Sequence, residues 1–422
     1  MNTKKTINIT IVAITAFLFL TNYPSAQAAE NLMLHAANGA VVDSTGSPVS
    51  LRCVSLSPWL DPEPYLTTKA FKSLITSPSQ FKQRLAALVG PDQAQDFWQQ
   101  WMDSFVTEND FKHLAQTGFN CVRLPLNYKY FVDSVDNGVV QFNQSGIQPV
   151  DNAVTWGQKY GIYVMIDLHV APGGQNVLST VADVPSNDTT ARLWEGPTAS
   201  QNKSLTVAIC HALAARYAQA TSVGGYDLIN EPALPKTVSK DALPTLYSAI
   251  IAAIRSVDPA HMIILEGDNY AHDFLTLVPP PDANVMYEFH EYAIGNRDWK
   301  TPNQQALNTF IQLRASSHMP LWLGEFGENT AIWQGQMVQL MKANNIGWAV
   351  WPWKRISDGN PVIQTIVMPD SWNKLSKYLV GAILSGKPAP AQAQEGMSQM
   401  LQAIRTQSCQ KDSSVEEMLA GK

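Results

Sequence analysis

The amino-acid sequence predicts a (β/α)₈ barrel, the TIM-barrel fold, and three observations support this prediction. Short apolar runs of strand length recur from about residue 50 onward, and longer amphipathic stretches separate them. The runs are nearly continuous in apolar residues, as expected of parallel strands that are covered on both faces. Nearly every run is followed by a polar or aromatic residue. In such barrels the C-terminal ends of the strands form the active site.

The apolar runs number eight, and we expect them to be the barrel strands: 49–56, 121–126, 162–168, 226–229, 262–265, 285–289, 321–323 and 346–350. Between them, apolar residues at helical spacing predict helices over 111–116, 205–219, 243–257, 304–316 and 331–344. An open doubly wound sheet would need fewer strands, and the sequence contains no G-x-G-x-x-G fingerprint. The barrel is therefore the leading fold.

The two ends of the chain carry different signals. Residues 1–28 have a basic start, an apolar stretch at 9–20 and the small-residue sequence Ala26-Gln27-Ala28, which is typical of a secretory signal peptide. The stretch is shorter than the roughly 20 residues of a membrane span. We expect an exported monomer, extracellular or periplasmic, without membrane association after cleavage. Residues 29–386 should form the catalytic barrel domain. Residues 387–422 should form a helix at 396–405 followed by a polar tail, and this segment should either pack on the barrel or trail from it.

Composition and charge narrow the classes of partner and cofactor. A hydrophobic content of 45% with 15% charged residues indicates a large buried core. The formal net charge is −6, and losing Lys4 and Lys5 with the signal peptide leaves −8, which argues against nucleic acid as a partner. Neither a C-x-x-C pair nor an H-E-x-x-H motif is present, which argues against a zinc knuckle and a catalytic metal. One or two disulfides are possible, and the pairing is left open among Cys53, Cys121, Cys210 and Cys409.

Two glutamates at strand ends are the candidate catalytic pair. Glu231 follows the fourth run, within Asn230-Glu231-Pro232, and Glu325 follows the seventh. A glutamate at the edge of an apolar core is costly unless it is paired, hydrogen-bonded or functional. Across a barrel mouth, two carboxylates suit glycoside hydrolysis. A separation of about 5–5.5 Å would give retention, and one of about 6.5–9.5 Å inversion. The alternative for each glutamate is a structural strand-end residue that caps a helix.

Other residues at the strand ends complete this candidate site. Arg123 ends an apolar run and needs a carboxylate partner. His290 and Tyr292 are two positions apart and therefore share one face of a strand. A tryptophan near the eighth run can serve as a platform for the apolar face of a sugar ring. Long insertions at 61–107 and 172–197 should lie on the catalytic face and wall a cleft, and they include Asn176, whose amide could contact sugar hydroxyls.

The motifs together resemble glycoside hydrolase family 5, the cellulase family of the retaining clan A hydrolases. The resemblance runs from about residue 51 to 354. It rests on short motifs that occur in register with the predicted strands: Trp59-Leu60-Asp61-Pro62-Glu63, Gly118-Phe119-Asn120-Cys121-Val122-Arg123-Leu124-Pro125, Asp167-Leu168-His169, Ala171-Pro172-Gly173, Asp227-Leu228-Ile229-Asn230-Glu231-Pro232, His290-Glu291-Tyr292, Gly324-Glu325-Phe326-Gly327 and Gly347-Trp348-Ala349-Val350-Trp351.

This resemblance implies a role for each matching residue and no cofactor. Glu231 would be the acid/base and Glu325 the nucleophile of a double displacement. The supporting residues would orient these two groups or contact the sugar: Arg123 and Tyr292 at Glu325, His290 near Glu231, Asn230 at the 2-hydroxyl, His169 at other hydroxyls, Trp351 as the floor of the cleavage subsite, and Trp59 after the first strand.

The substrate implied by the resemblance is a β-linked oligosaccharide or polysaccharide. The motifs after the first and third strands look most like the exo-β-1,3-glucanase and β-glucosidase branch. The loop at 177–188 lacks the acidic or aromatic pattern of that branch, so endo-β-1,4-glucanase and β-mannanase activities stay open. A transglycosylase would share every one of these residues. The alternative from a different class is a carbohydrate-binding barrel without catalysis.

Overall fold

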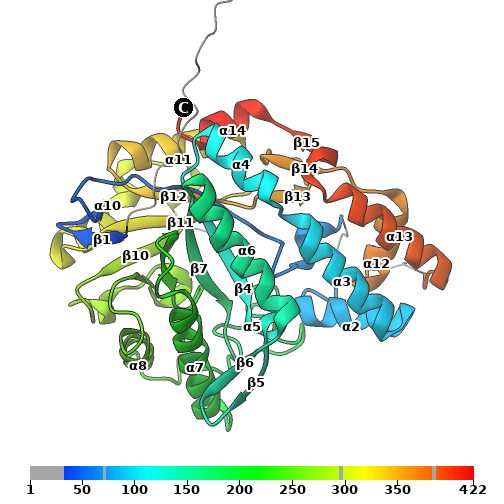
Figure 1. The fold of residues 1–422 in the computed structure, drawn as a ribbon, viewed down its shortest axis with the longest axis horizontal. Coiled ribbons are helices and arrows are strands. Elements are labelled where there is room, and N and C mark those ends of the chain that lie inside the picture. Colours follow the sequence, from blue (N-terminus) through cyan, green and yellow to red (C-terminus); the bar gives the residue numbers. More distant parts are fainter. Residues whose placement is uncertain (1–32, 70–72, 294–297, 383–385) are drawn as a thin grey trace, which may run out of the picture.

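The computed structural model describes residues 33–69, 73–293, 298–382 and 386–422, so the expected signal peptide at 1–28 lies outside it. Eight parallel strands close into a barrel in the order β10-β11-β12-β3-β4-β7-β8-β9 (Figure 1). They are β3 (Arg52–Ser55), β4 (Cys121–Asn127), β7 (Tyr163–Val170), β8 (Val223–Asp227), β9 (Met262–Glu266), β10 (Val285–His290), β11 (Leu321–Gly327) and β12 (Gly347–Trp351). Each of them overlaps one of the predicted apolar runs, so the predicted (β/α)₈ barrel is confirmed.

Strand β8 is displaced from its predicted position at both ends. This strand begins at Val223, three residues before the predicted run at 226–229, and it ends at Asp227. Its first half contains Gly224 and Gly225, which weaken an apolar signal. A Cβ at Gly225 would lie 2.8 Å from the carbonyl oxygen of Met262 on the neighbouring strand β9. Close approach of the two strands thus requires a glycine at this position. Because glycine does not count as an apolar residue, the start of β8 was not recognised as part of an apolar run.

Helices surround the barrel and cover the outer faces of the strands. They are α4 (Glu108–Thr117), α6 (Gln144–Tyr160), α7 (Ala199–Tyr217), α8 (Ala242–Arg255), α10 (Gln304–Ser317) and α11 (Ala331–Ala343). All but α6 were predicted from helical spacing. Helix α4 shows how the sequence sets a boundary: the Asp110 carboxylate accepts from the backbone N–H of Thr107 at 2.8 Å, and Gly118 ends the helix in the left-handed conformation.

The insertion at 61–107 is mostly helical rather than a loop. It contains α1 (Pro64–Thr67), α2 (Pro78–Val89) and α3 (Pro91–Phe105), each with a proline in its first turn. Helices α2 and α3 pack beside α12 (Asp370–Leu379) and α13 (Pro390–Ala403), as Figure 1 shows, around aromatic rings such as Phe97 and Trp372, which stack at 5.7 Å. The expectation that this insertion walls a cleft therefore holds only for its first few residues.

The C-terminal segment packs on the barrel. Helix α13 begins at Pro390, before the predicted 396, and the tail then forms η3 (Thr406–Ser408), β15 (Gln410–Lys411) and α14 (Ser413–Leu419). Strand β15 pairs with β14 (Gln364–Ile366), which pairs with β13 (Lys354–Ile356). The remaining short elements are β1 (Leu34–Ala37), β2 (Ala40–Asp43), α5 (Tyr128–Phe131), β5 (Val132–Asp136), β6 (Val139–Phe142), α9 (Asp268–Ala271), η1 (Leu275–Leu277) and η2 (Asp298–Lys300).

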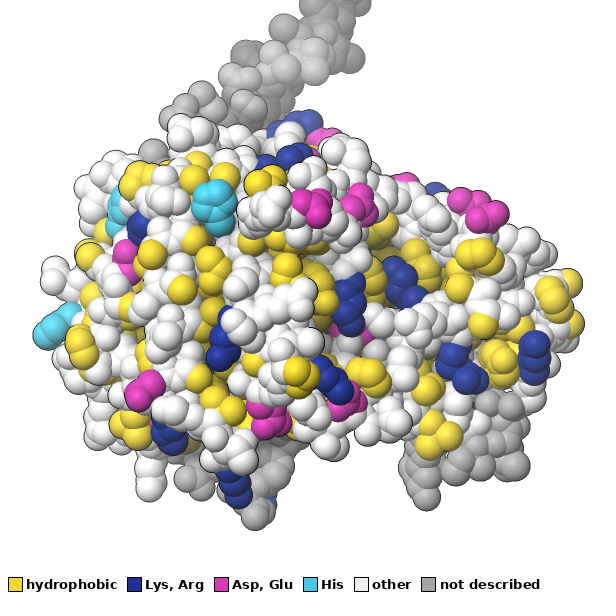
Figure 2. Space-filling model, turned by 90° about the horizontal axis from the view of Figure 1, so that it is seen from below, with side chains coloured by type: hydrophobic (Ala, Val, Ile, Leu, Met, Phe, Trp, Pro, Cys, Tyr) yellow, Lys and Arg dark blue, Asp and Glu magenta, His cyan; other side chains and the backbone are white. Residues whose placement is uncertain are grey.

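Cysteine pairing and surface charge complete the description of the fold. Cys53 and Cys121 form a disulfide between the neighbouring strands β3 and β4, where the two residues lie opposite each other in the strand register. Cys210 and Cys409 are free. Acidic and basic side chains are interspersed with apolar ones on the face in Figure 2. Within the described residues, no helix combines the length and the apolar character that crossing a membrane requires.

Candidate active site

A cavity of about 460 Å³ opens at the C-terminal ends of the barrel strands, within the size range of ligand sites. Six of the predicted site residues line it: His169, Asn230, Glu231, Tyr292, Glu325 and Trp351. Its walls also come from the beginnings of both long insertions, with Glu63 and Tyr65 from the first and Leu178, Thr180 and Val181 from the second. The structure thus brings most of the predicted site together around one space.

Glu325 is held at both carboxylate oxygens. The Arg123 guanidinium lies 2.5 Å from Oε1, and the Tyr292 hydroxyl donates to Oε2 at 2.8 Å. Burial, followed by the Glu325 charge, raises the pKa of Tyr292 well above its usual range, so this hydroxyl keeps its proton. Gly324 precedes Glu325 because a Cβ there would collide with the Glu288 side chain. Glu325 therefore has one orientation, and its charge is stabilised by two donors.

Glu231 is held through its backbone as well as its side chain. Its φ of 45° lies in the left-handed region, which is unfavourable for a residue with a Cβ. Two contacts fix this conformation: the Glu231 N–H donates to Glu266 Oε2 at 2.6 Å, and Asn176 Nδ2 donates to the Glu231 carbonyl oxygen at 2.9 Å. The side chain lies beside His290, whose Nδ1 is 2.9 Å from Glu231 Oε1. The strained turn thus aims one carboxyl group into the cavity.

The two glutamates face each other at short range. A carboxylate oxygen of Glu231, a ring nitrogen of His290 and a carboxylate oxygen of Glu325 all lie within 4.8 Å of one another. Burial lowers the pKa of His290 well below its usual value, so the ring is neutral between the two acids. Its Nε2 lies 3.1 Å from Glu288 Oε1. The ring therefore links Glu231 to a buried acid behind the cavity floor.

Arg123 is the centre of a buried cluster of carboxylates, the Arg123 cluster. Its guanidinium lies within 2.5–3.2 Å of carboxylate oxygens from five residues: Asp167, Asp227, Glu266, Glu288 and Glu325. All of these side chains are buried. Burial raises the pKa of both Asp167 and Asp227 to about 7, and that of Glu266 and Glu288 well above the usual range. One guanidinium cannot balance five carboxylates, so part of the cluster is protonated at neutral pH.

Four members of the Arg123 cluster were assigned no role from the sequence, namely Asp167, Asp227, Glu266 and Glu288. Their signal was an acidic residue within or directly after an apolar strand run, which is as costly as a strand-end glutamate. Asn230 also belongs here, because its Oδ1 accepts from Arg123 at 2.8 Å. This contact leaves the buried Nδ2 of Asn230 without a hydrogen-bond partner in the described part of the chain. Asn230 lines the cavity, so this donor is available to a ligand.

An aromatic pair forms one wall of the cavity. The rings of Trp351 and His169 are stacked with centroids 5.4 Å apart and planes 9° apart. Trp351 Nε1 donates to the Tyr65 hydroxyl at 2.9 Å, and His169 Nδ1 lies 2.7 Å from Asp167 Oδ2. Burial lowers the pKa of His169 to about 4, so its ring is neutral. Both rings are thus fixed from behind and present flat surfaces and edges to the cavity.

Two predicted residues have positions different from those expected. Trp59 is wrong as a substrate contact: its side chain is buried, its Nε1 donates to the Met102 carbonyl oxygen at 2.7 Å, and it does not line the cavity. The chain turns after β3, and this turn directs the indole toward α3 instead of the barrel mouth. Asn176 is also buried and supports the Glu231 backbone rather than facing the cavity. Glu328 also lines the cavity, and its carboxylate pairs with Arg355 at 2.8 Å.

Comparison with known proteins places the chain in a family. Residues 83–357 match the family model described as cellulase (glycosyl hydrolase family 5). The chain is 31% identical over 258 residues to a beta-xylosidase of Phanerodontia chrysosporium, covering 60% of this chain and 50% of the relative. It is 32% identical over 245 residues to a probable glucan 1,3-beta-glucosidase A of Aspergillus niger, covering 58% of this chain and 56% of that relative. The chain thus spans about half the length of these curated relatives.

The structural comparison agrees with the barrel fold. A crystal structure of endogalactoceramidase aligns with a TM-score of 0.58 at 18% identity, covering 87% of this chain and 84% of that one. At this level of identity the likeness concerns the fold alone. The family model spans more than half of the chain and includes every barrel strand except β3, with both cavity glutamates. The protein therefore belongs to glycosyl hydrolase family 5, the cellulase family.

Proposed function

We propose that this hydrolase cleaves β-glucosidic bonds of a glucan or glucoside by double displacement, with retention of anomeric configuration. The observation that carries the proposal is the pair of facing glutamates: oxygens of Glu231 and Glu325 lie within 4.8 Å of each other. Inverting enzymes need room for a water molecule and separate their carboxyl groups by about 6.5–9.5 Å. The shorter spacing favours direct attack by one of the two carboxylates.

Glu325 is the proposed nucleophile. Arg123 and Tyr292 bind one oxygen each, at 2.5 and 2.8 Å, and thus hold the carboxylate oriented toward the anomeric carbon. Attack forms a bond from a Glu325 oxygen to that carbon and breaks the bond to the leaving oxygen. The fixed donors are in place before the reaction, so little reorganisation is needed in the transition state.

Glu231 is the proposed acid/base. In the first step the charge of Glu325 favours the protonated form of Glu231, which donates its proton to the leaving oxygen. Esterification removes that charge, and Glu231 then accepts a proton from the water that attacks the glycosyl ester. The neutral His290 ring, 2.9 Å from Glu231 Oε1, orients the carboxyl group through both steps. One residue therefore serves as acid and then as base.

A β-linked glucose unit fits the rest of the cavity. Trp351 offers a flat surface to the apolar face of a pyranose ring, and the free Nδ2 of Asn230 can donate to the 2-hydroxyl. The similarity to relatives named as a glucan 1,3-beta-glucosidase and a beta-xylosidase supports a β-linked substrate for this chain. Endo-β-1,4-glucanase, β-mannanase and transglycosylase activities are the alternatives on the same residues. We also propose that the enzyme is secreted as a monomer after removal of residues 1–28.

The test is hydrolysis of β-1,3- and β-1,4-glucans, mannan and aryl β-glycosides by the wild type and by Glu325→Gln. We expect the substitution to reduce kcat on the order of 10⁴-fold, as for removal of other nucleophiles. Glu417→Gln, an exposed glutamate on α14, is the matched control and should keep full activity. Equal rates for the wild type and Glu325→Gln would refute the assignment. Product analysis at high acceptor concentration separates hydrolysis from transglycosylation.

A further inference from the structure

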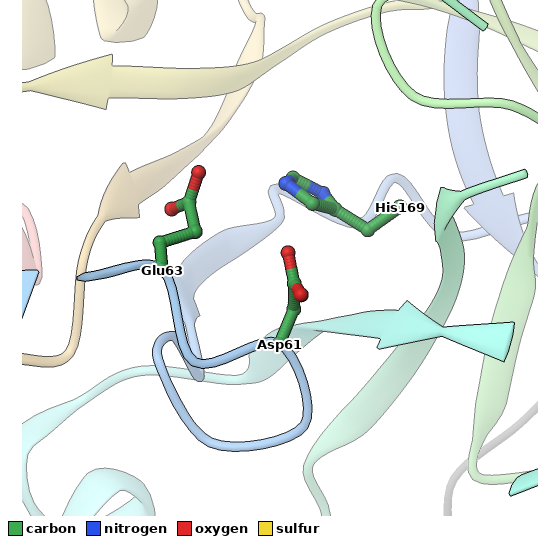
Figure 3. A group of neighbouring side chains, drawn as sticks. All are labelled: Asp61, Glu63 and His169. Atoms are coloured by element: carbon green, nitrogen blue, oxygen red, sulfur yellow. The ribbon is translucent and has the colours of Figure 1, made fainter. Parts of the chain in front are cut away.

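A second group of acidic side chains lies beside the catalytic pair. Asp61, Glu63 and His169 each offer one ligand atom, and these atoms all lie within 4.8 Å of one another. Figure 3 shows Asp61 and Glu63 on the loop that follows β3, with His169 reaching toward them from β7. All three side chains are at most 2% exposed. We call these residues the loop triad.

One oxygen of each carboxylate in the loop triad lacks a hydrogen-bond donor. Asp61 Oδ2 and Glu63 Oε2 are buried and have no hydrogen-bond partner among the residues that the structure describes. Neither residue forms an ion pair within the described ranges; the nearby Lys129 is 3.0 Å from Asp183 instead. A buried carboxylate oxygen without a donor is costly, and such atoms in a native protein call for an unmodelled partner. Two of them point into the same space.

His169 adds a third acceptor to this space. Its Nδ1 faces Asp167 Oδ2 at 2.7 Å, and its ring is stacked on Trp351, so the ring cannot turn freely. When Nδ1–H donates to Asp167, the lone pair of the neutral ring lies on Nε2. A carboxylate behind the histidine is the arrangement that orients histidines at metal sites. Three acceptors around one point can be satisfied together by one species with several positive or donor positions.

We propose that Asp61, Glu63 and His169 bind one divalent transition-metal ion, with Zn²⁺ and Mn²⁺ as the candidates. One imidazole and two carboxylates form a mixed nitrogen and oxygen donor set, which suits these ions better than an all-oxygen site would. Glu63 and His169 also line the catalytic cavity. With three protein ligands, the remaining coordination positions face this cavity, where they would take water or a hydroxyl of the sugar.

The backbone around the loop triad is already fixed for such a site. Asn127 donates from Nδ2 to Asp61 Oδ1 at 2.9 Å and from its N–H to the Leu60 carbonyl oxygen at 3.3 Å. The Glu63 N–H donates to the Asp61 carbonyl oxygen at 2.9 Å. These contacts hold the Asp61 carboxylate and the backbone of Glu63 in place without using the free oxygens. The ion would thus bind a largely preorganised site and tie the loop after β3 to the end of β7.

The test is isothermal titration of the full chain, after dialysis against EDTA, with ZnCl₂ and with MnCl₂. We expect one ion per chain, and an affinity that falls by about ten-fold or more in Asp61→Asn and in Glu63→Gln. Glu328→Gln is the matched control, because this carboxylate lines the same cavity but is already paired with Arg355. It should keep the affinity of the wild type. Anomalous scattering from a crystal grown with zinc should place the ion between the three side chains.

Circular dichroism of each variant separates loss of the site from loss of folding, and Glu63→Gln serves if Asp61→Asn does not fold. The inference is overturned if neither ion binds, if both variants bind the ion as the wild type does, or if Glu63→Gln weakens glucoside binding equally with and without metal. An enzyme that binds no ion and still depends on Glu325 for hydrolysis would refute this inference alone. The proposed function would then stand.

Discussion

Two groups of buried carboxylates share the mouth of this barrel, and they differ in what offsets their charge. The Arg123 cluster surrounds a guanidinium that lies within 2.5–3.2 Å of five carboxylates. The loop triad has two carboxylates, each with one oxygen that lacks a hydrogen-bond donor within the described residues. The first group holds both oxygens of Glu325 in one orientation, whereas the second keeps free acceptor oxygens beside the cavity. The difference indicates that one group is built to position an acid and the other to receive a positive partner.

Removal of Arg123 should have the largest effect on the molecule. Arg123→Met would leave the five carboxylates without their cation, and breaking a buried ion pair in this way costs about 3–5 kcal/mol. We expect the free energy of unfolding to fall by at least this amount and hydrolysis to be lost. Urea denaturation followed by fluorescence measures the first quantity. An unchanged denaturation midpoint would show that protons, rather than Arg123, offset the cluster.

Tyr292→Phe should separate chemistry from stability. The substitution removes the hydroxyl that donates to Glu325 Oε2 at 2.8 Å and leaves the ring and the Arg123 contact in place. We expect kcat to fall by about 10²–10³-fold, as for loss of one preorganised donor, with little change in melting temperature. Steady-state kinetics and thermal denaturation provide the two readouts. A kcat within two-fold of the wild type, on the order of experimental error, would remove Tyr292 from the proposed mechanism.

The pH dependence of stability should reveal the protons in the Arg123 cluster. Burial, followed by the neighbouring Asp167, raises the pKa of Asp227 from 3.8 to about 7 in the folded state. Between these values the folded protein binds more protons than the unfolded chain, so the contribution of Asp227 to stability is greatest at low pH and declines as pH rises toward 7. Melting temperatures from pH 4 to 8 should show this decline, and Asp227→Asn should flatten it. A variant with the same pH profile as the wild type would contradict the shift.

Neutralising the loop triad should have the smallest effect on stability. Glu63 has no ion pair in the described part of the chain to lose, so Glu63→Gln in EDTA should change the free energy of unfolding by less than about 1 kcal/mol. The contrast with Arg123→Met then measures how differently the two groups are compensated. A large destabilisation by Glu63→Gln in the absence of metal would mean that this carboxylate has a structural partner.

The sequence predicts the barrel and the catalytic pair because both depend on local patterns. Apolar runs mark the strands, and Glu231 and Glu325 follow two of them directly. The Arg123 cluster depends on which side chains point into the barrel lumen, which strand closure decides and a run of residues does not show. Asp167 and His169 are two positions apart on β7 and share a face, so the first could have been inferred from the second.

Other features depend on geometry that no local pattern carries. Cys53 and Cys121 are paired by the register between β3 and β4, which adjacent strands acquire only in the closed barrel. The orientation of Trp59 and the meeting of Asp61 with His169 depend on the path of the loop after β3. That loop has no periodicity from which its path could be read. Its contribution to the cavity therefore required the structure.

The stereochemistry of the first product tests the central claim most directly. The initial reaction with a soluble β-glucan oligosaccharide can be followed by proton NMR before mutarotation scrambles the new reducing end. Because Glu231 and Glu325 face each other within 4.8 Å, we predict that the β-anomer forms first and the α-anomer appears later, at the rate of mutarotation. Formation of the α-anomer first would mean inversion and would contradict the double displacement through Glu325.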